Sequence, residues 1–376
     1  MAIPPATADF RPLNVQEEKN MKKLFALIMA LAMVLSLAAC GGSGSTQTAD
    51  TAAGSAPAAD TADTAATSAA PAADTGDKTF TIGVCQLVQH DALDAATKGF
   101  QDYLTEKLGD KVTFDVQNAQ GDSATCSTIC TGFVSNNYDL IMANATPAVQ
   151  AAVSATSEIP IVGTSVTDYA TALADDAMDA TVGTGINVTG ASDGVPAQTY
   201  ADLVTELVPE AKNVSVLYCS AEANSVIQAD QFKECMEAAG ATVNIFTFAD
   251  SNDIQSVVTT AIDGADALYI PTDNTAASNM TIVSNVCEPA KIPVICGEQN
   301  MMMNGGLATA SISYYNIGRA AGEQAYQILV EGQDVAATPI AYDTNPVKMY
   351  NPAYAEAIGF TVPEGYEAAT ASETAE

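Results

Sequence analysis

Two polar residues occupy matching positions in the sequence, and their chemistry suits a small polar ligand. Thr146 lies seven residues after Asp139, and Asp273 lies seven residues after Asp266. In both places an apolar run separates the two residues and a helix-like stretch follows. A hydroxyl at a helix N-terminus favours an anionic group, whereas a carboxylate favours a cationic one.

A second pair repeats this pattern in the next unit of each half. Ser165 lies five residues after Pro160, and Glu298 lies five residues after Pro293. Each proline opens an apolar run that is typical of a strand. Because ligands bind outside the carboxyl ends of parallel strands, we expect both pairs to face one ligand site.

The elements that would position these residues alternate between strand and helix in two successive halves. Strand-like runs of the first half lie at 80–87, 112–120, 139–145 and 159–166, and helical patterns at 90–108, 123–137 and 146–156. The second half repeats this order with strands at 213–219, 242–248, 266–270 and 292–297, and helices at 224–240, 253–264 and 274–289. The repeat predicts an α/β fold of two similar doubly wound parallel-sheet lobes with a cleft between them.

The chain beyond the second half indicates how the lobes are joined. Residues 303–331 contain a strong helical pattern, which we assign back to lobe one. The predicted boundaries are 78–192 plus 303–331 for lobe one, 193–302 plus 332–365 for lobe two, and 366–376 for a disordered tail. Three crossings between the lobes predict a three-strand hinge near 190–196, 298–306 and 332–342.

The N-terminal part carries signals for export and tethering. Residues 21–39 combine two lysines, a short apolar stretch and small residues before Cys40, which is the pattern of a lipoprotein signal peptide. Cys40 would be lipidated and become the mature N-terminus, with an uncleaved anchor as the alternative. Residues 1–20 look like an upstream extension. The low-complexity stretch 40–77 predicts a disordered tether.

Composition excludes several classes of function. The chain has 13 Lys and Arg against 45 Asp and Glu, a formal net charge of -32, and its basic residues do not cluster. Nucleic-acid binding needs a basic surface, so we exclude it. With one His, and with cysteines that we interpret mainly as small core residues, we expect no metal site and no cofactor. No nucleophile-elbow or P-loop motif occurs, so we expect no enzyme.

Several segments together resemble one known family. They are HDALDAATKGF, NAQGD, ATPAVQAA, IPIVGTSVTD, NVTGASD, YIPTDNTAAS, IPVICGE and GGLATASISYYNIG. Over residues 79–365 the chain resembles the solute-binding lipoproteins of ABC importers, in the TrpX-like branch with the type I periplasmic-binding-protein fold. It departs from that branch at Asp91, where Pro is usual, and at Gly163 and Thr164, where a bulkier apolar residue is usual.

The resemblance implies capture of a small solute and its delivery to a membrane permease. In several members of the branch the solute is an aromatic amino acid. The resemblance also implies a protein that is exported and lipid-anchored to the outer face of the bacterial cytoplasmic membrane, and we expect a monomer. A ligand-sensing receptor for a signalling partner, or binding of a small polar solute that is not an amino acid, remain alternatives.

An amino acid ligand would need recognition of its carboxylate. We assign this role to Thr146, which precedes the helix at 147–156, because its hydroxyl lies beside free backbone N–H groups. Ser165 and Thr167, at the next strand end, would complete the cradle. An ordinary N-cap is the alternative role for Thr146.

The ammonium group would need acceptors, at least one of them anionic. Asp273 fits by position, Glu298 is a second candidate, and Asn274 could assist. The alternative for Asp273 is an N-cap of the helix that follows it.

Loops at the same strand ends supply further candidate ligand contacts. These are Gln86, His90, Ser192, Asp193, Glu222 and Asn224. A structural role is the alternative for His90, and a turn-forming role is the alternative for Asp193. Tyr314 and Tyr315 could stack on an aromatic ligand, although their position at a helix start also suits ordinary packing.

Overall fold

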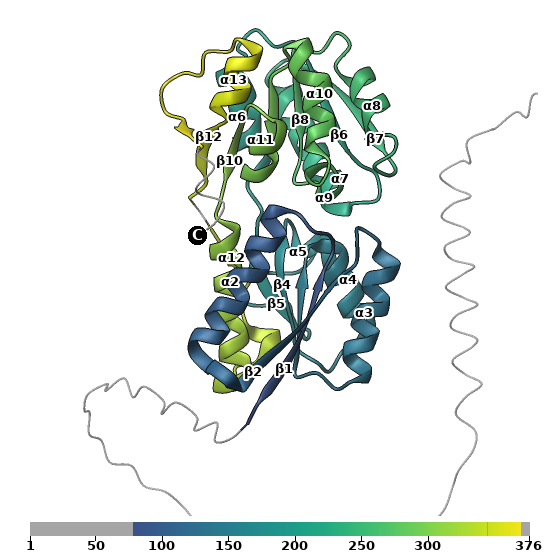
Figure 1. Cartoon of the computed structure of the whole chain (residues 1–376), viewed down its shortest axis with the longest axis vertical. Coiled ribbons are helices and arrows are strands. Elements are labelled where there is room, and N and C mark those ends of the chain that lie inside the picture. Colours follow the sequence, from purple (N-terminus) through teal and green to yellow (C-terminus); the bar gives the residue numbers. More distant parts are fainter. Residues whose placement is uncertain (1–77, 344, 370–376) are drawn as a thin grey trace, which may run out of the picture. The chain divides into compact units, whose positions relative to one another are not determined.

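The computed structural model describes residues 78–343 and 345–369, which form two helix-covered sheets (Figure 1). The predicted extension, signal peptide and tether, with Cys40, lie outside the described residues, as do residues 370–376. Among the described helices, none is both long enough and apolar enough to cross a membrane.

Lobe one is built on a parallel sheet with the strand order β11-β5-β4-β3-β1-β2. Its strands are β1 (Phe80–Gln86), β2 (Val112–Asn118), β3 (Leu140–Asn144), β4 (Ile161–Val166), β5 (Val188–Ser192) and β11 (Ala341–Tyr342). Its helices are α2 (Asp91–Leu108), α3 (Ser123–Ser135), α4 (Thr146–Ala155), α5 (Tyr169–Leu173) and α12 (Tyr314–Tyr326). Short 3-10 helices lie at Gly109–Lys111 and Val335–Ala337, and a π-helical segment continues α12 at Gln327–Glu331. Helices cover the sheet, so β3 and β4 are buried along their whole length.

Lobe two is built on a sheet with the strand order β13-β12-β10-β9-β8-β6-β7. Among the described residues of this sheet, β10 and β12 are the one antiparallel pair, and the other neighbouring strands run parallel. Its strands are β6 (Asn213–Cys219), β7 (Thr242–Phe248), β8 (Ala267–Ile270), β9 (Val294–Cys296), β10 (Ala308–Ser311), β12 (Val347–Tyr350) and β13 (Glu367–Ala368). Its helices are α6 (Ala197–Leu207), α7 (Ala223–Ala238), α8 (Ile254–Ala261), α9 (Asn274–Ala277), α10 (Met280–Ala290), α11 (Gln299–Gly305) and α13 (Pro352–Ile358). The predicted two-lobe α/β fold is confirmed.

The first connection between the lobes lies where it was predicted, near 190–196, and the other two lie later in the chain than predicted. The chain crosses between β5 and α6, between β10 and α12, and between β11 and β12. Strand β10 pairs with β9 of lobe two, so the return to lobe one that was predicted at 303 lies too early. Strand β11 pairs with β5 of lobe one, so the return to lobe two that was predicted at 332 also lies too early. A four-residue strand shows no clear period beside a strong helix, which explains the first error.

The predicted disordered tail also begins too early. Strand β13 pairs in parallel with β12, with Glu367 opposite Met349, and Ala369 is buried. Lobe two therefore extends to the last described residue.

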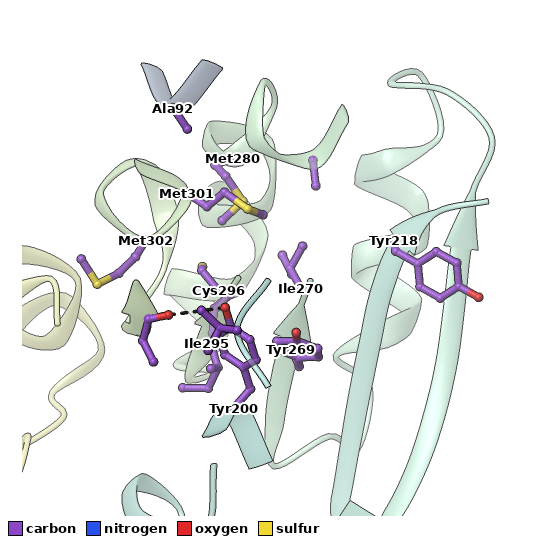
Figure 2. Close-up of a cluster of buried hydrophobic side chains, with 14 of the residues drawn as sticks. Ala92, Tyr200, Tyr218, Tyr269, Ile270, Met280, Ile295, Cys296, Met301 and Met302 are labelled. Atoms are coloured by element: carbon purple, nitrogen blue, oxygen red, sulfur yellow. Dashed lines mark hydrogen bonds between the residues drawn. The ribbon is translucent and has the colours of Figure 1, made fainter. Parts of the chain in front are cut away.

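The core of lobe two centres on stacked aromatic rings. Tyr269 of β8 lies 4.1 Å from the ring of Phe232 and 5.3 Å from that of Tyr200, between ring centroids. The Tyr200 hydroxyl donates to the carbonyl of Gly297, which ties α6 to the end of β9. The same apolar cluster includes Ala92, which belongs to α2 of lobe one (Figure 2). Apolar packing thus continues from one lobe to the other.

The cysteines of the described chain are free thiols. Six are buried, and Cys235 is half-buried. Their prediction as mainly small core residues is confirmed.

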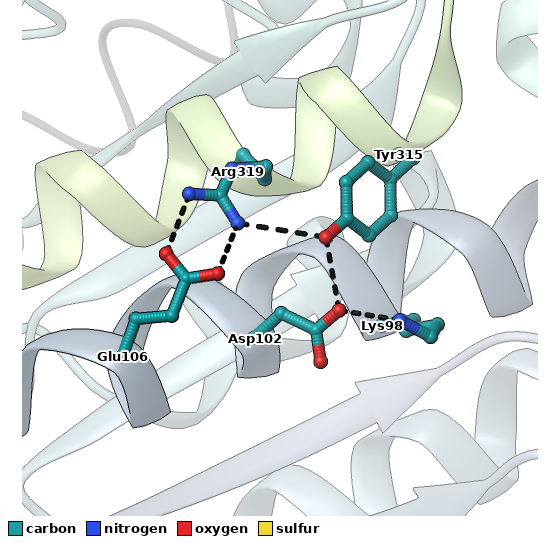
Figure 3. A network of polar contacts seen from close by, with 5 residues as sticks. All are labelled: Lys98, Asp102, Glu106, Tyr315 and Arg319. Atoms are coloured by element: carbon teal, nitrogen blue, oxygen red, sulfur yellow. Dashed lines mark hydrogen bonds and ion pairs between the residues drawn. The ribbon is translucent and has the colours of Figure 1, made fainter. Parts of the chain in front are cut away.

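Helices α2 and α12 pack unusually closely because glycines lie at their contact. A methyl group on Gly318 would collide with the backbone of Ala96, and one on Gly99 would collide with the backbone of Tyr315. At the surface of this contact Arg319 donates two hydrogen bonds to Glu106, at 2.9 and 2.8 Å (Figure 3). Both helices begin at the cleft, so this packing fixes their first turns relative to each other.

The Gly318→Ala variant tests this contact. We expect its free energy of unfolding to fall by about 3 kcal/mol, because the helices must separate to admit the methyl group. Gly132→Ala in α3 is the matched control, since the new methyl group meets no atom within 4 Å. It should be neutral or stabilising by about 0.5–1 kcal/mol through helix propensity. Urea unfolding measures both, and equal midpoints would contradict the tight packing.

Candidate functional site

A small cavity lies where the carboxyl ends of strands from both lobes meet. Its volume is about 10 Å³, which is room for about one water molecule. Its polar lining consists of His90, Ser165, Thr167, Asp193, Asn224, Thr272, Asp273, Asn274, Glu298 and Tyr314, and its apolar lining of Leu93, Ala277 and Met301. The structure therefore brings together eight of the twelve residues predicted to bind ligand.

The lobe-one wall offers buried hydroxyls without partners. Thr146 is the first residue of α4, and Ala145 holds the N-cap position, so the capping alternative for Thr146 is wrong. The side-chain oxygens of Thr146 and Ser165 are buried and have no hydrogen-bond partner among the described residues. Ala145 and Ser165 have φ values of 90° and 54°, a region that residues with a side chain rarely adopt. Thr146 lies beside the cavity without lining it.

Asp193 presents one unpaired carboxylate oxygen to the cavity. It directly follows β5, and its Oδ2 accepts a hydrogen bond from the Tyr314 hydroxyl at 2.7 Å. Its Oδ1 is buried without a partner among the described residues. Burial raises the pKa of the Asp193 carboxyl, although interactions with the side chains of Tyr314 and Thr167 oppose that shift. Such an oxygen is a strong acceptor for a cationic group that replaces the lost water.

Asp273, in contrast, is occupied by its own lobe. Its Oδ1 accepts from the backbone N–H of Ala276 and caps α9. Its Oδ2 accepts from the backbone N–H of Cys219 at 2.8 Å and from the Ser225 hydroxyl at 2.7 Å. Burial, with the negative charge of Glu222, raises the pKa of Asp273 to about 8. The capping alternative for Asp273 is confirmed, and this carboxyl joins β6, α7 and α9.

Glu222 holds the same helix from the other side. Its two oxygens accept four hydrogen bonds, from the backbone and side chain of Asn274 and of Thr275, at 2.7–2.9 Å. With both oxygens occupied, Glu222 does not line the cavity. Its position at a strand end thus reflects a structural role in lobe two.

Glu298 combines a structural role with a place in the cavity lining. It caps α11 by accepting from the backbone N–H groups of Asn300 and Met301. Burial raises the pKa of Glu298 to about 7. Each oxygen has one described donor, so each keeps capacity for a further hydrogen bond.

His90 and Asn274 form a bridge between the lobes. The Nε2 atom of His90, before α2, lies 3.3 Å from Oδ1 of Asn274 in lobe two. The His90 Nδ1 atom is buried and has no partner among the described residues, and the same holds for Oδ1 of Asn224. A second contact joins Asn304 to Asp91 at 3.4 Å. The lobes are therefore in contact around the cavity.

Gln86 and Ser192 serve as internal supports instead of lining the cavity. Gln86 donates to Val88 and Asp94 and accepts from Thr97. The Ser192 hydroxyl donates to the carbonyl of Thr167. The bonds to Val88 and Thr167 hold the segments that lead to His90 and follow β4, and the bonds to Asp94 and Thr97 tie β1 to α2.

Five lining residues were not among the predicted ligand contacts. They are Leu93, Thr272, Ala277, Met301 and Tyr314. Tyr314 was considered for aromatic stacking, and its neighbour Tyr315 instead donates to Asp102 on the outer side of the helix pair (Figure 3). Leu93 and Met301 lie in the first turns of α2 and α11, and Ala277 ends the short helix α9. Sequence alone does not separate such a pocket wall from core.

The fold and the cleft together are those of a protein that closes two lobes on a solute. The chain belongs to the ABC transporter substrate binding protein family, whose model matches residues 81–373. It is therefore the solute-binding component of a transporter, works outside the cytoplasm, and is not an enzyme. The family expected from the resemblance is confirmed.

Two relatives show the similarity in numbers. A tyrosine-binding protein of Clostridioides difficile is 38% identical over 266 residues, covering 70% of this chain and 76% of the relative. The crystal structure of an ABC domain from Streptococcus pneumonia in complex with L-Trp is 34% identical, with a TM-score of 0.73, covering 78% of this chain and 100% of that one.

A third relative bears on the arrangement of the lobes. The ligand-free, open structure of a substrate-binding protein from Clostridium difficile is 36% identical and covers 78% of this chain and 99% of its own. Its TM-score is only 0.59, against 0.73 for the tryptophan complex, although the identity is slightly higher. The lobes described here are thus arranged more as in the tryptophan complex.

The buried carboxyls predict a pH dependence of stability. The pKa of Glu298 is raised to about 7 and that of Asp273 to about 8, and that of Asp193 is also raised, in each case chiefly by burial. The folded state then binds more protons than the unfolded state, so stability falls as pH rises from about 5 to 8. We expect a loss on the order of 2 kcal/mol across this window. Burial lowers the pKa of His90, so this one residue makes stability rise with pH and partly offsets the effect of the three carboxyls.

Thermal unfolding at several pH values measures this effect. Repeating the series at about 0.5 M salt removes most surface repulsion and leaves the contribution of the buried groups. A melting temperature that rises with pH under both conditions would show that these carboxyls are not perturbed as described.

Proposed function

We propose that this protein captures an aromatic amino acid outside the cytoplasm and delivers it to the permease of an ABC importer. The observation that carries the proposal is the set of unpaired buried atoms at the cavity. Among the described residues, the Ser165 hydroxyl, a carboxylate oxygen of Asp193 and the amide oxygen of Asn224 are unpaired and belong to residues of the cavity lining, and the unpaired Thr146 hydroxyl lies at the neighbouring strand end. Donors beside acceptors complement a zwitterion. The names of the tyrosine-binding and tryptophan-bound relatives support an aromatic side chain.

The ligand carboxylate is assigned to the lobe-one hydroxyls. Thr146 stands at the first turn of a ten-residue helix, α4, where the helix dipole favours an anion. Ser165 and Thr167 follow at the end of the neighbouring strand β4 and line the cavity. The unpaired hydroxyls supply donors to a carboxylate without disturbing other bonds.

The ligand ammonium is assigned to Asp193, with Asn224 as a second acceptor. This differs from the sequence-based assignment to Asp273, whose oxygens already accept three hydrogen bonds. Among the described residues, Oδ1 of Asp193 has no hydrogen-bond partner. An ammonium group that enters the buried site would donate a hydrogen bond to this oxygen and pair with the carboxylate charge.

Binding then requires the lobes to separate and close again. A cavity of about 10 Å³ does not admit an aromatic amino acid, so the ligand enters an opened form. Closing on the ligand would bring His90 back toward Asn274 and Asp91 back toward Asn304. Ligand contacts made with both lobes favour the closed form over the open one.

The proposal includes a lipid anchor at Cys40 and a monomeric protein. The support for the anchor is the sequence alone: a basic start, an apolar stretch and small residues before this cysteine. In cells of the producing organism, a Cys40→Ser variant should move from the membrane fraction to the medium. Retention in the membrane would point to an uncleaved anchor instead.

The experiment that tests the function identifies the ligand directly. Purified protein is denatured, and the released small molecules are identified by mass spectrometry. Candidate amino acids are then titrated into ligand-stripped protein by calorimetry and thermal shift, since a bound ligand raises the melting temperature. Tyrosine or tryptophan is expected. If only compounds without an amino group bind, the proposal fails.

A further inference from the structure

The hydrogen-bond network around His90 fixes which ring nitrogen carries the proton. The amide nitrogen of Asn274 donates to Glu222 at 2.7 Å, so its amide oxygen must face His90. Glu222 also accepts three other hydrogen bonds, so it holds this orientation firmly. Because Oδ1 of Asn274 only accepts, Nε2 of His90 must be the atom that donates. In the neutral ring Nδ1 is then a bare acceptor.

The environment of His90 favours that neutral ring. Burial lowers the pKa of the His90 imidazole, and this effect exceeds the opposing influences of the Asn274 hydrogen bond and of the carboxylates Glu222, Asp94 and Asp91. The Nδ1 atom has no hydrogen-bond partner among the described residues and is shielded from solvent. An unpaired acceptor of this kind is unfavourable unless a ligand supplies a donor.

The position of His90 is that of a contact with the ligand side chain. The small cavity adjoins a groove of about 280 Å³, and the two share His90, Ala277, Glu298 and Met301. Leu93, Ala277 and Met301 are the apolar residues of the cavity lining. The groups assigned to the ligand carboxylate do not line this groove. The groove is lined mainly by polar residues, and its apolar members are Ala277, Met280 and Met301. A ring directed toward the groove would contact Ala277 and Met301, which the groove and the cavity share, and reach the polar groups beyond them, His90 included.

We infer that His90 selects aromatic amino acids whose ring carries a hydrogen-bond donor, by accepting the phenol O–H or indole N–H on its Nδ1 atom. This inference rests on the proposed function and deepens it. Tyrosine and tryptophan both carry such a donor, whereas phenylalanine would bury Nδ1 unpaired. A site built to accept a hydrogen bond discriminates strongly against an isostere that lacks the donor.

The test compares three ligands and three proteins by titration calorimetry. Tyrosine, tryptophan and phenylalanine are titrated into the wild type, into His90→Gln and into Asn304→Ala. Glutamine can place its amide N–H near the position of Nε2 and keep the bond to Asn274, but it lacks the Nδ1 acceptor. Asn304→Ala is the matched control, because it removes the other contact between the lobes and leaves the Nδ1 acceptor of His90 in place. Asn304 lines the groove but not the cavity, so this variant also shows what a change in the groove alone does.

The wild type and Asn304→Ala should both prefer tyrosine and tryptophan to phenylalanine by about tenfold or more. In His90→Gln the three affinities should agree to within about twofold, with the phenylalanine affinity little changed. An equal loss for all three ligands in His90→Gln would overturn the inference, since His90 would then only hold the lobes together. Equal affinities of the wild type for tyrosine, tryptophan and phenylalanine would also overturn the inference, while the proposed binding of aromatic amino acids would stand. If none of the three binds the wild type, the proposed function itself fails.

Discussion

The Asp193→Asn variant is expected to bind its aromatic amino acid about 100-fold more weakly than the wild type. Asparagine keeps the shape of the side chain, and its oxygen can still accept the hydrogen bond from Tyr314. Its NH₂ group would then face the ligand ammonium in place of the unpaired Oδ1. The buried ammonium would lose both an acceptor and its counter-charge. Titration calorimetry measures the change.

Asp168→Asn is the matched control for this variant. Asp168 undergoes the same chemical change, but it caps α5 by accepting from Thr171 and does not line the cavity. Its affinity for the ligand should equal that of the wild type. Similar affinities for Asp193→Asn and the wild type would disprove the assignment of the ammonium to Asp193.

The Asp273→Ala variant should instead lose stability, by about 3 kcal/mol or more. Its removal leaves the backbone N–H groups of Cys219 and Ala276 and the hydroxyl of Ser225 without their acceptor inside lobe two. At temperatures where the variant is folded, its ligand affinity per folded molecule should change by less than about threefold.

Denaturant unfolding and calorimetry, carried out on the same preparation, separate the two effects. If the free energy of unfolding of Asp273→Ala were unchanged and its ligand binding were abolished, Asp273 and not Asp193 would be the residue that binds the ligand ammonium. Together the two aspartate variants distinguish a carboxylate that binds ligand from one that holds the lobe together.

The sequence was sufficient to predict the architecture because the spacing between the start of a strand and the polar residue after its end is the same in both halves. The spacing from Asp139 to Thr146 and from Asp266 to Asp273 marks the carboxyl ends of β3 and β8, and both residues lie at the cleft. Strand ends of a parallel sheet meet at one edge, so position alone selected most of the lining.

The sequence could not predict which acidic residues are free. Asp273 and Asp193 both follow a strand, and the difference between them is set by distant partners. The N–H of Cys219 and the hydroxyl of Ser225 reach Asp273 from other elements, 54 and 48 residues away. No local pattern reports such contacts. The same limit applies to Glu222, whose partners also belong to another element.

The hydrogen bond between Tyr314 and Asp193 joins two of the three places where the chain passes between the lobes: Asp193 lies in the connection from β5 to α6, and Tyr314 directly follows the connection from β10 to α12. Connections of this kind define the axis about which lobes turn. A cross-link near a rotation axis changes little in length when the lobes bend apart, but it resists a twist of one lobe against the other. The opening motion should therefore approach a single degree of freedom, and each closure should return the two walls of the cleft in the same register.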